Sequence, residues 1–220
     1  MQSHLLISST IESIHPDENG IKALEMMKHF RINHLAIVKN EFFLGVISDK
    51  EILRWDSKEE YIDEHLENLN SPFVKFDQHL FDIIEVIEKN NLSIVPVLDE
   101  NNKYLGVITS RKMMYTIAKT STIQSEGGVI VLEMNKYDYS LAKISSIIES
   151  NNTQILSSHI IPKNQSKDIE LTLKLNADDI SHILNDFERH GYKVSASYRK
   201  QKEDTDFLDR YESLMRFLNP

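Results

Sequence analysis

The sequence predicts an α+β protein that begins with a duplicated module and continues into a smaller domain with a different pattern. The segment LGVIS at 44–48 returns as LGVIT at 105–109, and the helix and strand patterns before it return in register. A polar stretch at 119–127 then separates the duplication from a further run of strand and helix patterns. A period of about sixty residues that occurs only twice is not typical of a solenoid. We therefore expect two units packed with pseudo-two-fold symmetry around a small-molecule cleft.

Each repeat has the pattern of a helix, two strands and a second helix. In the first repeat, apolar residues at helical spacing predict a helix at 21–30, and short apolar runs predict strands at 35–38 and 42–47. In the second repeat, the corresponding helix is expected at 81–90 and the strands at 94–98 and 104–108.

The second helix of each repeat is expected to begin at a side-chain cap. Ser48 is followed three residues later by Glu51, which is the capping-box pattern at the start of a predicted helix at 49–55. Thr109 repeats the cap, but Lys112 replaces the carboxylate. Both hydroxyls are therefore expected at the N-terminus of a helix.

The part of the chain after the polar stretch alternates strands and helices in another order. We expect strands at 129–134, 153–161, 169–175 and 192–198, and helices at 141–148 and 178–190. Pro162 is expected to stop the second of these strands, and Gly191 the second helix. The order β-α-β-β-α-β is ferredoxin-like, and an amphipathic helix at 203–218 is expected to close the chain.

These patterns predict the domain organisation. A tandem module is expected at 1–118, with repeats at about 8–56 and 69–118 and an acidic, mostly helical connector between them. A linker at 119–127, a domain at 128–199 and the helix at 203–218 are expected to follow.

The composition excludes several classes of function. The formal net charge of −9, without any long run of lysine or arginine, argues against nucleic-acid and membrane-surface partners. The absence of cysteine removes disulfides and thiolate chemistry, and together with the lack of a signal-peptide pattern it favours a cytoplasmic location. The nine histidines are scattered, and no catalytic or metal-binding motif is present, so we expect neither an enzyme nor a metal site.

The repeated block resembles the CBS domain, a family that occurs as tandem pairs. The resemblance is carried by GVIS at 45–48 and GVIT at 106–109, the apolar strands at 35–38 and 95–98, and SIHPD at 13–17, which is similar to the start of a CBS unit. The region at 128–199 is similar to ACT domains. Together the two regions resemble the acetoin-utilisation type of bacterial CBS protein. Architecture of this kind does not fix a function, so we do not extend the acetoin role to this chain.

The resemblance implies a regulatory function, because CBS pairs bind adenosine-containing ligands between their units. In that family the hydroxyl after the glycine triplet and an acidic residue three positions later hold the ribose, while the preceding apolar strand forms a slot for the purine. Basic residues nearby are expected to meet phosphates. The ligand contacts implied in this chain are Ser13, His34, Ala36, Ser48, Lys50, Glu51, Pro96, Thr109, Arg111 and Lys112.

The chain departs from the family pattern in both repeats. The first repeat has Glu51 in place of the usual aspartate, and the second has Lys112 at that position. Loss of a hydrogen bond to a charged group, worth about 1.5–3 kcal/mol, weakens binding about ten- to a hundredfold. The sequence therefore favours the site at Ser48 and Glu51 over the site at Thr109.

Simpler structural explanations stay open for the same residues. Ser48, Glu51 and Thr109 can act only as helix caps, and the glycine of each repeat can serve only close backbone packing. Because Pro96 has no N–H to donate, it is expected to mark an edge strand or, as the alternative, a place where something other than a neighbouring strand approaches. In the ACT-like region the loop at 135–141 keeps the family's aspartate, but it lacks the glycine that lets the backbone close on an amino acid.

These observations lead to one main hypothesis and two alternatives. The main hypothesis is a non-enzymatic regulatory sensor of ATP, ADP, AMP or S-adenosylmethionine that requires no cofactor and forms a homodimer. The first alternative is a dimerisation or scaffold protein with degenerate ligand sites. The second is amino-acid sensing by the ACT-like domain. The sequence does not identify the protein that such a sensor would regulate.

Overall fold

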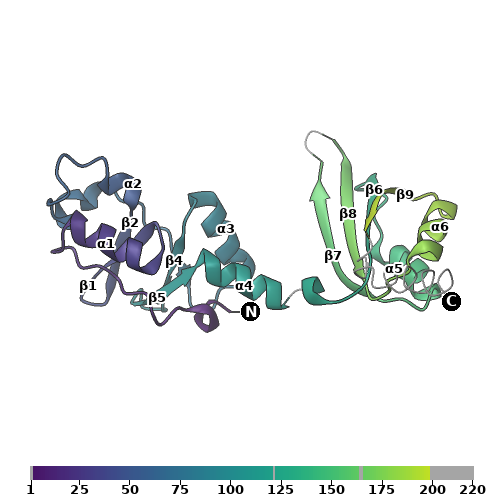
Figure 1. Ribbon diagram of the computed structural model, residues 1–220, viewed down its shortest axis with the longest axis horizontal. Helices are drawn as coiled ribbons and strands as arrows, with labels where there is room; N and C mark the ends of the chain where they lie inside the picture. Colours follow the sequence, from purple (N-terminus) through teal and green to yellow (C-terminus); the bar gives the residue numbers. More distant parts are fainter. Residues whose placement is uncertain (1, 121, 164–165, 199–220) are drawn as a thin grey trace, which may run out of the picture. The chain divides into compact units, whose positions relative to one another are not determined.

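The computed structural model describes residues 2–120, 122–163 and 166–198, and the chain divides after Ile117 into two compact units (Figure 1). The predicted C-terminal helix at 203–218 lies outside the described residues. None of the described helices is long and apolar enough to cross a membrane.

The first unit contains the duplication. Repeat one consists of α1 (Gly20–Phe30), β1 (His34–Lys39), β2 (Phe42–Ser48) and α2 (Asp49–Ile52), preceded by the 3-10 helix η1 (Ser3–Leu6). Repeat two consists of β3 (Val74–Lys75), α3 (Leu80–Asn90), β4 (Ile94–Leu98), β5 (Tyr104–Thr109) and α4 (Ser110–Thr120). The 3-10 helix η2 (Ile62–Asn68) lies between the repeats.

The two repeats match in detail. β1 and β2 pair antiparallel, as do β4 and β5, and each pair has its register shift at the same place, after Ile37 and after Val97. β3 adds a parallel strand to β4, and Ile14 makes the corresponding parallel bridge to Ile37. The first helix and the two strands predicted for each repeat are therefore confirmed.

The connector between the repeats is less helical than its sequence suggests. α2 ends at Ile52 rather than continuing to residue 55, and only residues 62–68 of the acidic stretch form a helix, of the 3-10 type. The connector returns to the start of α1, where the Lys58 carbonyl accepts the Ile21 N–H and the Glu60 carbonyl accepts the Gly20 N–H. The connector thus satisfies helix-end donors that have no partner inside α1.

The segment before each repeat crosses over to the other repeat. Ser8 donates its N–H to the carbonyl of Val107 at 2.8 Å, and Val46 donates to the carbonyl of Asn70 at 3.0 Å. The buried Ser3 hydroxyl donates to the carbonyl of Lys75. The first residues of the chain therefore complete repeat two, although they precede repeat one.

The repeated glycines lie where these segments cross. A Cβ atom on Gly106 would lie 2.6 Å from Cγ2 of Ile7, and one on Gly45 would lie 3.2 Å from Cβ of Leu69. Gly106 also has a φ of +141°, which side chains rarely adopt. Close packing of the crossing segments therefore accounts for the glycine in both copies of the duplicated motif.

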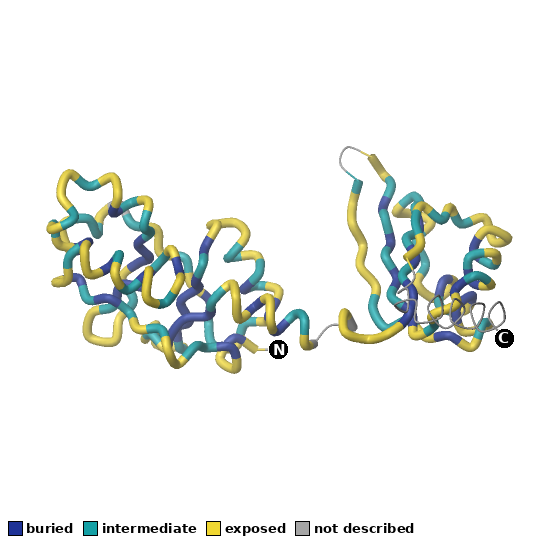
Figure 2. The backbone as a smooth tube through the Cα atoms, in the orientation of Figure 1, coloured by how far each residue is buried: buried dark blue, intermediate teal, exposed yellow. Residues whose placement is uncertain are grey.

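Each repeat has its own apolar core, and each core receives residues from the other repeat. The core of repeat one includes Ile94 and Val107 from repeat two. The core of repeat two includes Leu6 from the N-terminal segment and Val46 from β2. Figure 2 shows the buried strands at the centre of this unit. Because each core contains side chains from the other repeat, the two repeats pack together as one unit.

Pro96 lies in a middle strand, so its prediction as an edge marker is wrong. β4 is flanked by β3 and β5. The strand tolerates proline because β3 pairs only with Val97 and Leu98, and because Val107, which lies opposite Pro96, turns its carbonyl towards Ser8. The missing N–H of Pro96 therefore removes no ladder hydrogen bond.

The second unit is a four-stranded antiparallel sheet covered on one face by two helices (Figure 1). Its elements are β6 (Val129–Asn135), α5 (Leu141–Ser150), β7 (Ile155–Pro162), β8 (Asp168–Leu175), α6 (Ser181–Arg189) and β9 (Lys193–Tyr198), in the sheet order β7-β8-β6-β9; the 3-10 helix η3 (Thr122–Gln124) precedes them. Burial alternates along β8 as its sequence predicts.

Most boundaries in the second unit differ from the prediction by one to three residues, and two of these differences have a local cause. Pro162 is the last residue of β7 rather than its stop, and it pairs with Ile169. A proline fits there because β7 is an edge strand, much of it exposed (Figure 2). α6 begins at Ser181 rather than at 178, because the Asp179 carboxylate accepts the Ser181 N–H at 3.0 Å before the first turn.

Tyr104 leads to a prediction about stability. Its hydroxyl is buried, no hydrogen-bond partner for it lies among the described residues, and burial raises the pKa of the phenol. Because an unsatisfied buried hydroxyl is costly, Tyr104→Phe is expected to raise the free energy of unfolding by about 1 kcal/mol. Urea unfolding checks this, with Tyr115→Phe, at a tyrosine that is 63% exposed, as the control. A clear loss of stability in Tyr104→Phe would contradict the account.

Candidate functional site

Two cavities lie on either side of the contact between the repeats. The Ser48 cavity, of about 420 Å³, is lined by Asn33, His34, Ser48, Asp49, Lys50, Asn90, Asn91, Leu92, Ser93 and Ser110. The Thr109 cavity, of about 400 Å³, is lined by Ser8, Thr10, Ile11, Phe30, Arg31, Ile32, Asn33, Ser93, Thr109, Ser110, Arg111, Lys112 and Tyr115. Both volumes fit a small ligand.

The pseudo-symmetry of the repeats relates the two cavities. The Ser48 cavity combines the cap of α2 in repeat one with the end of α3 in repeat two. The Thr109 cavity combines the cap of α4 in repeat two with the end of α1 in repeat one. Each cavity is therefore built by both repeats.

Asn33 and Ser93 line both cavities and join the repeats between them. The Asn33 N–H donates to the Ser93 hydroxyl oxygen at 2.9 Å. Each of the two residues also uses its carbonyl to accept an N–H from the first residue of the following helix, Asp49 or Ser110, at 3.0 Å. A ligand in either cavity would thus touch the junction between the repeats.

His34 adds a polar contact at this junction. Its Nδ1 accepts the N–H of Ser93 at 3.2 Å and lies 3.1 Å from the Ser93 hydroxyl oxygen. Because Nδ1 is the acceptor, the neutral ring carries its proton on Nε2. Burial lowers the pKa of His34, and the nearby carboxylates of Asp49 and Glu51 partly oppose that shift.

The His34 contact predicts a pH dependence of stability. Because the pKa of His34 is lowered in the folded state, the unfolded state binds more protons as the pH falls below 6.5. Stability is therefore fully present above this value and is lost as the pH falls towards the lowered pKa. Unfolding followed by the fluorescence of Trp55, the single tryptophan, should show this loss in the wild type.

A matched pair of variants identifies the source of the pH effect. In His34→Asn the side-chain oxygen can replace Nδ1 as the acceptor, and the pH-dependent loss below 6.5 should shrink. His159→Asn, at an exposed histidine of the second unit, should leave the loss unchanged. An unchanged pH profile in His34→Asn would contradict the assignment.

Ser48 and Glu51 form the predicted capping box. The Glu51 carboxylate accepts the Ser48 N–H at 2.7 Å and the Ser48 hydroxyl at 2.6 Å, while the Ser48 oxygen accepts the Glu51 N–H at 3.2 Å. The hydroxyl hydrogen of Ser48 is therefore already donated within the box. Glu51 does not line the Ser48 cavity.

Thr109 caps α4, but its hydroxyl makes fewer hydrogen bonds than the Ser48 hydroxyl does. Its oxygen accepts the Lys112 N–H at 2.9 Å, and no acceptor for its hydroxyl hydrogen lies among the described residues. The lining of this cavity also includes the exposed cations Arg31, Arg111 and Lys112. The Thr109 cavity thus offers a hydroxyl donor together with positive charge.

The structure gathers some of the predicted ligand contacts and leaves others apart. His34, Ser48 and Lys50 line one cavity, and Thr109, Arg111 and Lys112 line the other. The remaining four, Ser13, Ala36, Glu51 and Pro96, line neither cavity, and Ala36 and Pro96 are buried in strands. The two strand residues expected to form the purine slot therefore face neither of these cavities.

Several residues of the cavities were missed by sequence reasoning. Arg31 and Asn91 occupy matching positions at the ends of α1 and α3, and Ser8 and Thr10 come from the N-terminal segment. Lining up the helix ends of the two repeats would have found Arg31 and Asn91. No signal in the sequence indicates that residues 8 and 10 reach repeat two.

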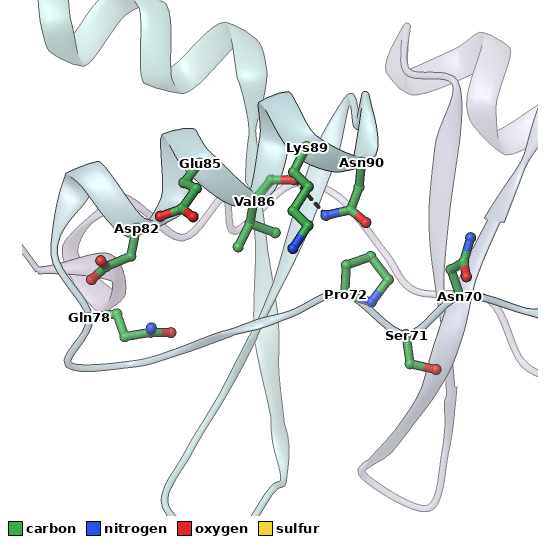
Figure 3. Close-up of a pocket in the computed structure, with 9 residues that line it drawn as sticks. All are labelled: Asn70, Ser71, Pro72, Gln78, Asp82, Glu85, Val86, Lys89 and Asn90. Atoms are coloured by element: carbon green, nitrogen blue, oxygen red, sulfur yellow. Dashed lines mark hydrogen bonds between the residues drawn. The ribbon is translucent and has the colours of Figure 1, made fainter.

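Another groove runs along α3 but contains none of the predicted contacts (Figure 3). Most of its polar groups are already used. The Asp82 carboxylate accepts the His79 N–H at 2.9 Å, Ser71 donates its hydroxyl to the carbonyl of Leu44, and Asn90 donates to the carbonyl of Val86. We therefore do not assign a ligand to this groove.

The second unit offers a weaker candidate site. A cavity of about 630 Å³ in this unit is lined by Ala142, Lys143, Ser146, Ile147, His190 and Tyr192. The ACT-like loop at 135–141 is held by its own contacts: the Asn135 side chain accepts the Tyr137 N–H, and the Asn135 carbonyl accepts the Asp138 N–H. Among the described residues, no group of three or more acidic or histidine side chains is placed to hold a metal.

Comparison with known proteins identifies the first unit. Residues 4–58 and 66–119 each match the family model of the CBS domain. The chain is 22% identical over 110 residues to inosine-5'-monophosphate dehydrogenase of Methanocaldococcus jannaschii. That match covers 50% of this chain and 22% of the dehydrogenase, so the chain spans less than a quarter of this curated relative.

Two solved structures are similar to about half of this chain. A CBS domain pair/ACT domain protein from Thermotoga maritima is 14% identical, with 54% of this chain and 98% of that chain covered and a TM-score of 0.49. The protein CBSX2 in complex with AMP is 16% identical, with 54% and 96% covered and a TM-score of 0.48. The two matches to the family model, in register with the duplicated elements, show that residues 4–119 of this chain are a tandem pair of CBS domains.

Proposed function

We propose that the CBS pair is a non-enzymatic regulatory module that binds an adenosine-containing ligand between its repeats. The observation that carries this proposal is that both repeats line each cavity and meet at Asn33 and Ser93. A ligand that contacts both repeats favours the arrangement in which they are held together, and such differential affinity is what shifts a conformational equilibrium.

Of the two cavities, the Thr109 cavity is the better candidate for a nucleotide. The Thr109 hydroxyl can donate to a ribose or phosphate oxygen, whereas the Ser48 hydroxyl donates to Glu51. Arg111 and Lys112 supply positive charge for phosphates. This order of preference is the reverse of the one suggested by the sequence, where the acidic residue of repeat one was expected to hold the ribose.

Titration calorimetry with adenosine, AMP, ADP, ATP and S-adenosylmethionine tests the proposal. We expect heat of binding with at least one of them, and about a tenfold or greater loss of affinity in Thr109→Ala, because the variant lacks the hydroxyl that would donate to the ligand. Ser48→Ala removes the matching cap and should leave the affinity within about twofold. Absence of heat with all five ligands at millimolar concentration would overturn the proposal.

The main alternative is a scaffold protein whose ligand sites have degenerated. It is favoured by the internal use of the Glu51 carboxylate and by the presence of Lys112 where the family has an acid. The ultraviolet absorbance of the supernatant after denaturation of the purified protein separates the two functions. A co-purified purine supports sensing, whereas its absence together with silent calorimetry supports the scaffold.

For the second unit we propose an ACT-like domain and a contribution to homodimer formation. Support comes from the ferredoxin-like order of its elements and from the exposed edge strand β7, which carries Ile160 and Ile161 on its surface. Mass measurement in solution tests the dimer. Thermal stabilisation by one amino acid but not by nucleotides would instead support amino-acid sensing.

A further inference from the structure

Arg31 occupies a backbone conformation at the Thr109 cavity that arginine seldom adopts. It follows α1 with φ 56° and ψ 49°, in the left-handed region that favours glycine and asparagine. At the matching position after α3, next to the Ser48 cavity, the residue is Asn91, with φ 51° and ψ 48°. The two helix ends thus have one geometry, and only one of them has the residue that this geometry prefers.

The helix end itself does not require the guanidinium. The Arg31 N–H donates to the carbonyl of Lys28 at 3.3 Å, as the Asn91 N–H donates to the carbonyl of Glu88 at 3.2 Å. These bonds use only the backbone, so any residue able to adopt the conformation would cap α1 equally well. None of the ion pairs among the described residues involves Arg31. Within the part of the chain that the structure describes, the Arg31 side chain therefore has no ion-pair partner that would explain its presence.

The charge around Arg31 distinguishes the two cavities. The lining of the Thr109 cavity contains Arg31, Arg111 and Lys112 and no carboxylate. The lining of the Ser48 cavity contains one cation, Lys50, and one carboxylate, Asp49, which accepts the Asn33 side-chain N–H at 2.8 Å. Of these two cavities, the Thr109 cavity is therefore the one with a net positive lining, and its charge comes from both repeats.

We infer that Arg31 is a specificity-determining residue that makes the Thr109 cavity select phosphorylated over unphosphorylated adenosine ligands. This inference depends on the proposed function, because it concerns the same cavity. A guanidinium presents paired N–H groups that match the geometry of a phosphate. Arg31 belongs to repeat one, whereas Arg111 and Lys112 belong to repeat two, so a polyphosphate held by all three connects the repeats. The Ser48 cavity, with Asn91 in the matching place, lacks this selection.

Calorimetry on the full chain with adenosine, AMP and ATP tests the inference in the wild type and in Arg31→Asn. The variant receives the residue found at the matching position, so its thermal midpoint should equal or exceed that of the wild type. Its affinity for ATP should fall about ten- to a hundredfold, while its affinity for adenosine should stay within about twofold. A role limited to folding would instead change the midpoint and leave the preference for ATP intact.

Two controls make the outcome specific. Lys28→Gln removes an exposed positive charge from the same helix, outside both cavities, and should change the preference for ATP less than twofold. Arg31→Lys keeps the charge without the paired donors and should give an intermediate preference. If adenosine and ATP both fail to bind the wild type, the proposed function is overturned. If both bind and Arg31→Asn keeps the wild-type ratio of affinities, only the assignment to Arg31 is overturned.

Discussion

Replacing Gly106 with alanine is expected to lower the free energy of unfolding of the CBS pair by about 2–4 kcal/mol. The new Cβ atom would lie 2.6 Å from Cγ2 of Ile7, so the crossing N-terminal segment must move. The φ of +141° adds conformational strain for any residue with a side chain. Urea unfolding followed by Trp55 fluorescence, which reports on this unit, measures the effect.

Gly45→Ala provides the matched control in the other repeat. Its Cβ atom would lie 3.2 Å from Cβ of Leu69, which is a tight contact but a less severe one, and its φ is not in the positive range. We expect about half the loss seen for Gly106→Ala. Equal losses of stability at both positions, or no loss at Gly106, would show that close packing of the crossing segments is not the reason for glycine at these positions.

The second large effect is expected at Leu6, which lies near the N-terminus but belongs to the core of repeat two. Leu6 is 3% exposed, whereas its neighbour Leu5 is 64% exposed. Leu6→Ala should cost about 2–4 kcal/mol, because it leaves a cavity between the N-terminal segment and the core. Leu5→Ala should cost less than about 0.5 kcal/mol. The same urea titration checks both variants.

If Leu6→Ala were as mild as Leu5→Ala, residues 2–8 would not be an integral part of repeat two. Proteolysis gives an independent measure, since a docked segment resists cleavage to the extent that the folded form is populated. Leu6→Ala should be trimmed faster than the wild type at the N-terminus, and Leu5→Ala should not.

The sequence predicted the regular elements of this fold well, because they depend on local pattern. Apolar spacing in the repeats and clean alternation at 169–175 each had one physical interpretation, and the structure has the corresponding helices and strands. The connector at 56–69 was predicted poorly. Its acidic pattern predicts a helix, but its carbonyls instead accept hydrogen bonds from the N–H groups at the start of α1. These contacts join residues far apart in the sequence, so local pattern does not predict them.

The candidate site was predicted only in part, for a similar reason. The caps Ser48 and Thr109 follow from local spacing, and both line cavities. Whether a hydroxyl hydrogen is free depends on the neighbouring side chains, and Glu51 uses the one on Ser48. The sequence did not predict a role for Arg31, because the positive φ at this helix end is seen only in the structure. The comparison with Asn91 at the matching helix end then shows that arginine is unusual there.

Hydrogen exchange of the full chain with and without ATP tests the central claim, which is that a ligand bridges the two repeats. The account predicts slower exchange of backbone amides at both 31–33 and 109–112, because the Thr109 cavity is built from both segments. Exchange across the second unit should change little. Unchanged exchange at saturating ATP, or protection confined to one repeat, would contradict the claim.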